Sequence, residues 1–191
     1  MPKQLIFVLG GARSGKSRFA EQLASQGGRV LYVATAEALD DEMRLRIAAH
    51  RRQRPADWDT LEEPIALPTV LGRVLEGYDT CLLDCLTLWI SNMLLAAEDS
   101  PNAEQEILSA ADELLELYER SSATWIVVSN EVGLSVVPAS PLGRTFRDVQ
   151  GRVNQMMAAR ADRAYMLIAG LATDLKALGA VPINSGRVSP H

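Results

Sequence analysis

The segment that most constrains the fold lies near the amino terminus, where an apolar run leads directly into a glycine-rich loop. Residues 5–9 (LIFVL) are continuously apolar, and the next eight residues fit the pattern G-x-x-x-x-G-K-[ST]: Gly10-Gly11-Ala12-Arg13-Ser14-Gly15-Lys16-Ser17. A continuous apolar run that ends at glycine predicts a strand buried on both faces, as in a parallel sheet. A helical pattern then begins at about Lys16. A strand, a tight loop and a helix in this order are the setting of a phosphate-binding loop.

In such a loop, glycines allow the backbone N–H groups to point inward at phosphate oxygens. The amino terminus of the helix adds a partial positive charge. Lys16 is predicted to reach the β- and γ-phosphates of a nucleotide, which makes it a candidate catalytic residue, and Ser17 to place its hydroxyl on Mg²⁺. The alternative is a glycine-rich turn that precedes Lys-Ser by chance. The strand–loop–helix context favours the phosphate site.

The rest of the chain alternates strand-like and helix-like patterns. We expect further strands at 30–34, 81–84, 125–128 and 165–168, and helices from 16 and at 39–52, 70–75, 86–97, 103–120 and 143–161. Strands that alternate with helices predict βαβ units and a mostly parallel sheet flanked by helices. Together with the phosphate loop, this predicts an α/β fold of the P-loop NTPase (RecA-like) type, as a single domain over residues 1–178. Residues 179–191 are expected to form a loosely held tail.

Composition narrows the possible functions. The chain has 191 residues and a net charge of −5, so the strongly basic face of a nucleic-acid-binding protein is not expected. It has two histidines, His50 and His191, and two cysteines, Cys81 and Cys85, which we expect to face the same side of a buried strand. These counts exclude a His/Cys zinc site and a disulfide framework. No apolar run approaches the roughly 18 residues of a membrane span, so we expect a cytosolic protein without membrane insertion.

Asp84, at the end of the strand predicted at 81–84, is the best candidate for a second Mg²⁺ ligand. In phosphate-loop enzymes that ligand is an acid at the end of a neighbouring buried strand. The alternative is an acid that caps the next helix. The chain lacks the D-x-x-G and N-K-x-D motifs of a GTPase and the L-S-G-G-Q motif of a transporter ATPase. A small-molecule kinase or a nucleotidyltransferase remains.

His50 lies among arginines in an otherwise acidic protein. The surrounding arginines are Arg44, Arg46, Arg51, Arg52 and Arg54. One interpretation is a solvated helical face that carries a surface histidine. The other is a set of guanidinium groups that face polyphosphate, since arginine matches phosphate oxygens in a planar fork. An imidazole held neutral by that positive charge could attack phosphorus as a covalent nucleophile.

These features, taken in order, resemble the bifunctional adenosylcobinamide kinase / adenosylcobinamide-phosphate guanylyltransferase family of cobalamin biosynthesis. The resemblance runs from about residue 5 to residue 175. The segments that carry it are the phosphate loop, Ala34-Thr35-Ala36, residues 40–43, 46–55 and 58–62, Ser129-Asn130-Glu131-Val132-Gly133, Val137-Pro138 and residues 146–155. A phosphate loop alone is generic, whereas this ordered set is specific.

The resemblance implies two reactions at one nucleotide site, with ATP and GTP as substrates and Mg²⁺ as cofactor. Adenosylcobinamide is phosphorylated, and GMP is then transferred from GTP to that phosphate through a guanylylated histidine, which is His50 here. Implied nucleotide contacts are the phosphate loop, Ala34-Thr35-Ala36, Arg51-Arg52-Gln53-Arg54, Glu62 and Asp84. A homotrimer is also implied. The other function left open is a P-loop kinase that acts on a different small alcohol without nucleotidyl transfer.

Several assignments stay open at this stage. Glu62 could accept hydrogen bonds from guanine or be a surface acid. Glu131 could be a base for the substrate hydroxyl or could orient the Gly133 loop. Three residues are expected on the polar outer face of the last helix, where they could reach a neighbouring subunit or the corrinoid, or could be solvated: Arg147, Arg152 and Asn154. One departure from the family pattern is Ala49, where a relative has a second histidine.

Overall fold

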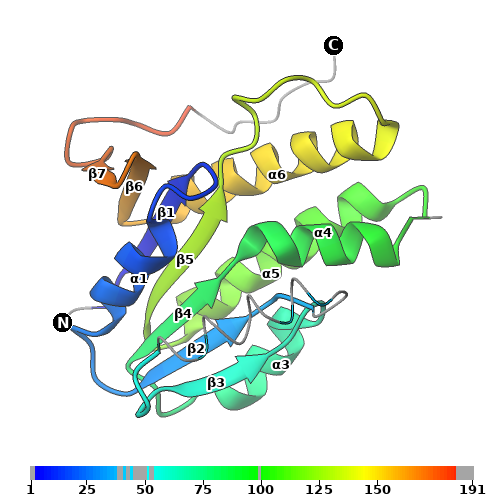
Figure 1. Cartoon of the computed structure of the whole chain (residues 1–191). Coiled ribbons are helices and arrows are strands. Elements are labelled where there is room, and N and C mark those ends of the chain that lie inside the picture. Colours follow the sequence, from blue (N-terminus) through cyan, green and yellow to red (C-terminus); the bar gives the residue numbers. More distant parts are fainter. Residues whose placement is uncertain are drawn as a thin grey trace.

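The computed structural model describes residues 3–37, 41, 44, 51, 54–98 and 100–183. Within these residues the chain forms one seven-stranded sheet (Figure 1). The strands are β1 (Leu5–Gly10), β2 (Val30–Ala34), β3 (Asp59–Glu62), β4 (Thr80–Asp84), β5 (Thr124–Asn130), β6 (Arg163–Ile168) and β7 (Leu171–Asp174). They lie in the order β3-β2-β4-β5-β1-β6-β7, and every pairing is parallel except that of β6 with β7.

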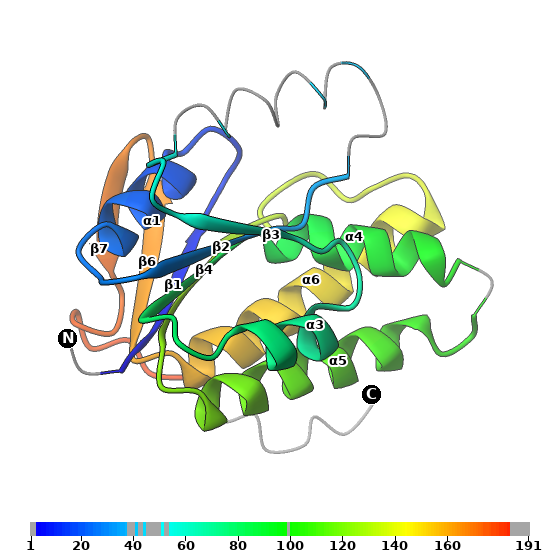
Figure 2. The same ribbon diagram turned by 90° about the horizontal axis from the view of Figure 1, so that it is seen from below.

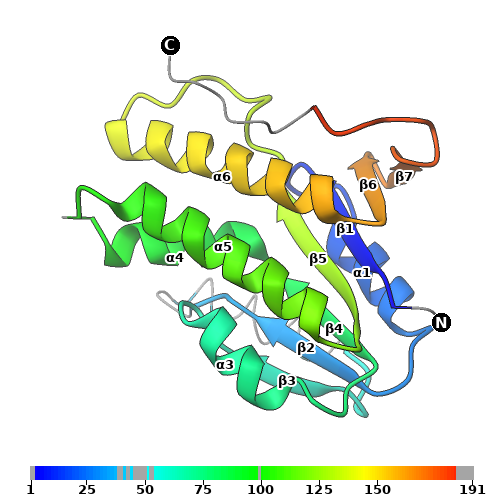
Figure 3. The same ribbon diagram turned by 180° about the vertical axis from the view of Figure 1, so that it is seen from behind.

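Helices cover both faces of this sheet (Figures 2 and 3). The helices within the described residues are α1 (Lys16–Ala24), α3 (Leu67–Val74), α4 (Leu86–Ala96), α5 (Ala103–Arg120) and α6 (Pro141–Arg160). One core cluster joins alternate strand residues such as Phe7 and Val33 to α3, α4, α5 and α6. The other joins the intervening residues, such as Val8 and Tyr32, to α1. The predicted α/β fold with a mostly parallel sheet is therefore confirmed.

Strand and helix positions agree with the sequence pattern where the pattern is strongly apolar. The five predicted strands and the predicted helix at 103–120 are all present. The helix predicted at 70–75 begins earlier, at Leu67, with a proline in its first turn, where the missing N–H costs nothing. The helix predicted at 39–52 falls mostly outside the described residues. The boundary at 178 stays a prediction, because residues 184–191 are also outside the described part.

The expectation for the two cysteines is wrong. Both thiols are buried, but Cys81 lies in the cluster under α3–α6 and Cys85 in the cluster under α1. A strand would place both on one side, since the side-chain period is two residues. Here β4 ends at Asp84, and Cys85 is already the residue that precedes α4. Because Cys85 lies outside β4, the period-two rule does not extend to it.

No helix among the described residues is both long and apolar enough to span a membrane.

A candidate nucleotide site at the carboxyl ends of the strands

The phosphate loop folds as a tight turn between β1 and α1, and its backbone requires glycine at two positions. Gly15 precedes α1 with φ of 93°, a conformation that costs other residues energy. A Cβ atom on Gly10 would lie 2.6 Å from the carbonyl oxygen of Leu167 and 2.7 Å from the Ser14 Oγ. The first glycine is therefore fixed by the close approach of β6, and the second by backbone conformation.

The turn between β6 and β7 supports this loop from the side. The N–H of Gly170 donates to the carbonyl of Ser14 at 3.1 Å. Ala169 and Gly170 both have positive φ, 52° and 79°, as a two-residue hairpin turn requires.

The Ser14 hydroxyl is buried and has no hydrogen-bond partner among the described residues. A buried hydroxyl without a partner costs free energy, and a phosphate oxygen in the loop would satisfy it.

A cavity of about 260 Å³ opens beside the phosphate loop. Its walls come from the loop, from the carboxyl ends of β2, β3, β4 and β5, and from the start of α4. The lining residues are Ala12, Arg13, Lys16, Ser17, Tyr32, Ala34, Ala36, Arg54, Glu62, Asp84, Cys85, Leu88 and Asn130. The carboxyl ends of parallel strands are where ligands bind in open α/β sheets.

Asp84, Tyr32 and Arg54 form a connected group on one wall of this cavity. The Tyr32 hydroxyl donates to Oδ2 of Asp84 at 3.0 Å. Burial, and then the charge of Asp84, raises the pKa of Tyr32 far above its usual value, so the hydroxyl stays a donor. The Arg54 guanidinium carbon lies 3.5 Å from the centre of the Tyr32 ring, as in a cation–π contact. Arg54 Nε and Nη1 are buried and have no partner in the described part of the chain.

The oxygen donors at the cavity suit a magnesium ion. The Ser17 hydroxyl and the Asp84 carboxylate both line it, and Mg²⁺ prefers a few oxygen ligands together with substrate phosphates. The Lys16 ammonium donates to the carbonyl of Gly11 at 3.1 Å. The residues predicted for phosphate and for metal are therefore brought to one place.

The second cysteine also reaches the cavity, but as an inert group. Burial, followed by the charge of Asp84, raises the pKa of the Cys85 thiol to about 11. A thiol at that pKa is protonated at neutral pH and is a poor nucleophile.

An open groove continues outward from the cavity past Arg54 and Glu62. Arg51, Trp58 and Thr60 also line it. Arg51 pairs with Glu62, and both side chains are about half exposed, 54% and 49%. An exposed pair of this kind contributes little to stability, so a ligand can displace it at small cost. The structure thus places Glu62 and two of the predicted arginines, Arg51 and Arg54, together.

Comparisons with known proteins identify the family of the chain. Residues 6–175 match the family model described as cobinamide kinase / cobinamide phosphate guanyltransferase. The chain belongs to this family. A bifunctional adenosylcobalamin biosynthesis protein CobP of Pseudomonas aeruginosa is 48% identical over 170 residues, which cover 88% of this chain and 95% of that protein. The CobU of Salmonella typhimurium is 41% identical over 180 residues, covering 90% of this chain and 99% of that one.

Solved structures that resemble the chain at low identity support the fold alone. The RadB recombinase has a TM-score of 0.50 at 18% identity, covering 86% of this chain and 74% of that one. An ATPase of a bacterial type III secretion system has a TM-score of 0.52 at 12% identity, and the match spans 58% of its length. The predicted P-loop NTPase fold is therefore confirmed, as is membership of the cobinamide kinase family.

Not every residue implied by the family reaches the cavity. The Thr35 side chain is fully buried: its hydroxyl donates to the Cys85 carbonyl at 2.7 Å and accepts from the Cys85 N–H at 3.0 Å. Asn92 donates to the Thr35 carbonyl at 2.8 Å. Thr35 thus joins β2 to the start of α4, while its neighbours Ala34 and Ala36 line the cavity. His50, Arg52 and Gln53 lie outside the described residues, so their roles stay predictions.

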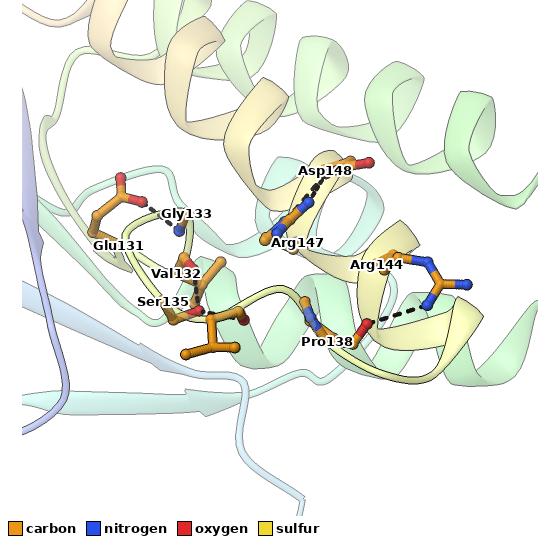
Figure 4. Close-up of polar contacts among 9 residues, drawn as sticks. Glu131, Val132, Gly133, Ser135, Pro138, Arg144, Arg147 and Asp148 are labelled. Carbon is orange, nitrogen blue, oxygen red and sulfur yellow. Dashed lines mark hydrogen bonds and ion pairs between the residues drawn. The ribbon is translucent and has the colours of Figure 1, made fainter.

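Glu131 and Arg147 contact neighbouring residues (Figure 4) and are not among the residues that line the cavity. One oxygen of Glu131 accepts the Gly133 N–H at 2.6 Å, which is the loop-orienting contact. Arg147 contacts Asp148 at 3.4 Å, and Arg152 pairs with Glu104. The expectation that Asn154 lies on a polar outer face is wrong, because its side chain is buried.

Asn154 is buried because it belongs to a polar network between β5 and α6. Its Oδ1 accepts from the Ser129 hydroxyl at 2.7 Å and from the Gln150 amide at 3.0 Å. Its own amide donates to the carbonyl of Asn130 at 3.1 Å. Asn130 in turn lines the cavity, and its Oδ1 is buried without a partner in the described chain. The network therefore fixes the end of β5 beside the phosphate loop.

Sequence reasoning missed Tyr32 and left Asn130 without a role. Tyr32 lies within an apolar strand segment, where the pattern predicts only a buried core residue. The one available signal was that a tyrosine buried in a strand usually has a hydrogen-bond partner for its hydroxyl.

A larger cavity, of about 360 Å³, lies at the opposite, amino ends of the strands, among residues such as Gln4, Gln26 and Thr124. It contains no part of the phosphate loop.

Proposed function

We propose that this chain phosphorylates adenosylcobinamide and then transfers GMP from GTP to the product, giving adenosylcobinamide-GDP and pyrophosphate. The observation that carries the proposal is the single cavity that gathers Lys16 and Ser17 with Asp84, Arg54 and Glu62, in a chain of the cobinamide kinase family. One nucleotide site with phosphate-binding, metal-binding and base-recognising groups can serve both reactions.

In the kinase step, the triphosphate lies in the phosphate loop. Lys16 and the loop N–H groups stabilise the charge on the transferring γ-phosphoryl group. Ser17 and Asp84 would hold Mg²⁺, which when bound neutralises charge on the β- and γ-oxygens. The hydroxyl of adenosylcobinamide attacks the γ-phosphorus, and the nucleoside diphosphate leaves.

In the guanylyl-transfer step, an imidazole nitrogen of His50 attacks the α-phosphorus of GTP and pyrophosphate leaves. Arg51 and Arg54 would hold the departing phosphates through their guanidinium groups. The phosphate of the corrinoid then attacks the same phosphorus and releases His50. Glu62 would accept hydrogen bonds from guanine N1–H and its amino group, after its ion pair with Arg51 opens. The roles of Arg51, Arg54 and Glu62 rest on the family resemblance and on the cavity and groove that they line. The role of His50 rests on the family resemblance alone.

The decisive experiment compares the two histidines of the chain. Wild-type protein, His50→Ala and His191→Ala are incubated with [α-³²P]GTP and Mg²⁺, and acid-labile label on the protein is counted. We expect label on wild type and on His191→Ala and none on His50→Ala. Label that persists on His50→Ala would refute the role of His50.

The alternative, a kinase without nucleotidyl transfer, gives a different result in the same assay. It predicts no label on any of the three proteins, although phosphoryl transfer to an alcohol still occurs. The cytosolic location and the homotrimer remain part of the proposal, and light scattering after size-exclusion chromatography measures the second.

A further inference from the structure

Tyr32 touches two groups of the proposed nucleotide site and has no role in the function proposed above. It lies on β2 and is only 2% exposed. Its hydroxyl bonds to Asp84, its ring carries the guanidinium of Arg54, and the ring of Trp58 stacks further along at 6.5 Å. The Tyr32 side chain thus connects Asp84, a proposed metal ligand, with Arg54, which is proposed to bind phosphate.

The contact with Asp84 holds one oxygen of that carboxylate. Oδ2 accepts the Tyr32 hydroxyl, and the structure gives Oδ1 no such donor within the described residues. A hydrogen bond of this kind fixes the rotation of a carboxylate and directs its other oxygen. Partners that orient metal ligands in this way typically change metal affinity 10- to 100-fold when they are removed.

The contact with Arg54 positions a guanidinium group in which two nitrogens lack a partner among the described residues. Nε and Nη1 of Arg54 are buried and find no acceptor in the described chain, although the group lines the cavity. Burying such donors is unfavourable unless an acceptor arrives. An anionic ligand in the cavity supplies that acceptor, and the Tyr32 ring holds the donors in place beforehand.

We propose that Tyr32 is a positioning residue for nucleotide and metal: its hydroxyl sets the Asp84 carboxylate for Mg²⁺, and its ring sets Arg54 for the phosphates. This inference rests on the proposed nucleotide site. The two contacts use different parts of the side chain, so they can be removed one at a time.

The test uses full-length protein, Mn²⁺ as the metal probe and α,β-methylene-GTP, which cannot transfer GMP. Tyr32→Phe removes the hydroxyl and keeps the ring, whereas Tyr32→Leu removes both. Electron paramagnetic resonance measures Mn²⁺ affinity in the presence of the nucleotide, and calorimetry in EDTA measures nucleotide affinity without metal. Both are recorded well below the melting temperature of each variant.

A matched control is Tyr118→Phe. Tyr118 also donates to an aspartate, Asp162 at 3.2 Å, and has a cation over its ring, Lys3 at 4.5 Å. It lies away from the cavity, so the variant removes the same kind of bond without touching the site.

For Tyr32→Phe we expect Mn²⁺ affinity to fall about tenfold, with metal-free nucleotide affinity within about twofold of wild type. Tyr32→Leu should in addition lower metal-free nucleotide affinity by about tenfold. Tyr118→Phe should change neither. Mn²⁺ affinity of Tyr32→Phe within twofold of wild type, or an equal loss in Tyr118→Phe, would overturn the inference alone. Wild-type protein that binds no nucleotide would overturn the proposed function as well.

Discussion

Tyr32 and Tyr118 have nearly the same neighbours at opposite ends of the sheet. Tyr32, at the carboxyl ends of the strands, has an aspartate on its hydroxyl, an arginine over its ring and a tryptophan beside it. Tyr118, at the amino ends, has Asp162, Lys3 and Trp125 in the corresponding places. Residue types alone do not distinguish these two regions.

The two regions differ in whether their polar atoms have hydrogen-bond partners. At the Tyr118 end, Lys3 donates to the Glu119 carbonyl at 2.8 Å, and Asp162 accepts a second hydrogen bond from the Leu5 N–H at 2.7 Å. At the Tyr32 end, two buried nitrogens of Arg54 have no partner among the described residues. A saturated set of contacts stabilises the fold, whereas an unsaturated one costs stability until a ligand binds. The comparison therefore separates a cluster that stabilises the fold from one that we propose to bind a ligand.

We expect the largest effect from removing the cation that lies over each tyrosine ring, Arg54 over Tyr32 and Lys3 over Tyr118. Arg54→Met should slow guanylylation of the protein by about 10³-fold, comparable with the loss of an arginine that stabilises phosphoryl transfer. Its melting temperature should stay level or rise, because two unpaired buried donors disappear. Lys3→Met should leave the rate within about twofold. The measurements are the rate of [α-³²P]GTP labelling and a thermal melt. A stable Arg54→Met protein with normal labelling would contradict the distinction between the Tyr32 and Tyr118 clusters.

We expect the next largest difference between the two regions when Asp84 and Asp162 are each replaced by asparagine. Asp84→Asn is expected to lower turnover about 100-fold and to raise the Mg²⁺ concentration needed for half-maximal rate. Asp162→Asn should instead keep normal turnover but lose about 1–2 kcal/mol of unfolding free energy, because its two hydrogen bonds no longer go to a charged acceptor. Mg²⁺ titrations and urea denaturation of both variants measure these effects. A normal Mg²⁺ requirement in Asp84→Asn would remove Asp84 from the metal site.

Thr35 offers a further test because it lies beside the proposed nucleotide site, yet its hydroxyl both donates and accepts a hydrogen bond within the protein. Thr35→Val removes the hydroxyl and leaves the N–H of Cys85 buried without its acceptor. We expect a loss of about 2–3 kcal/mol in the free energy of unfolding, with nucleotide affinity within about threefold of wild type. Thr173→Val on the exposed strand β7 should be nearly neutral. Loss of nucleotide binding by a folded Thr35→Val protein would instead indicate a direct role at the site.

The smallest expected effect concerns alkaline pH at the structural end. Burial, and then the charge of Asp162, raises the pKa of Tyr118 to about 12, against about 10 in an unfolded chain. Between these values the unfolded chain loses its proton first, so the contribution of Tyr118 is complete below pH 10 and falls as pH rises to about 12. After allowance for solvent screening, this amounts to about 1 kcal/mol.

Urea denaturation across that pH window should show a shallower decline of stability for Tyr118→Phe than for wild type. Parallel declines would mean that the pKa of Tyr118 is not raised in the folded protein.

How far the sequence predicts this fold depends on whether a contact is local. The strand, loop and helix of residues 5–24 follow from neighbouring residues, as do the other apolar strands. Strands β3 and β7 escape the pattern because they are short and largely exposed edge strands; the four residues of β3, from Asp59 to Glu62, include two acids. The insertion of β5 between β1 and β4 is also invisible in sequence, because pairing order depends on long-range packing.

The same limit applies to the candidate site. The phosphate loop and Asp84 were predictable, since each is marked by its place at a strand end. The contact between Tyr32 and Asp84 joins positions 52 residues apart, and no spacing rule links them. Asn154 was placed on a polar face by helical periodicity, but the Ser129 hydroxyl and the Gln150 amide make burial of its side chain favourable.

The turn at Gly170 has a consequence for how the protein is made. The phosphate loop is synthesised well before its lateral support from Leu167 and Gly170, because these residues come much later in the sequence. At about 5–20 residues per second, the brace is synthesised many seconds after the loop. We therefore expect a nascent chain to gain nucleotide affinity only when β6 and β7 have emerged from the ribosome.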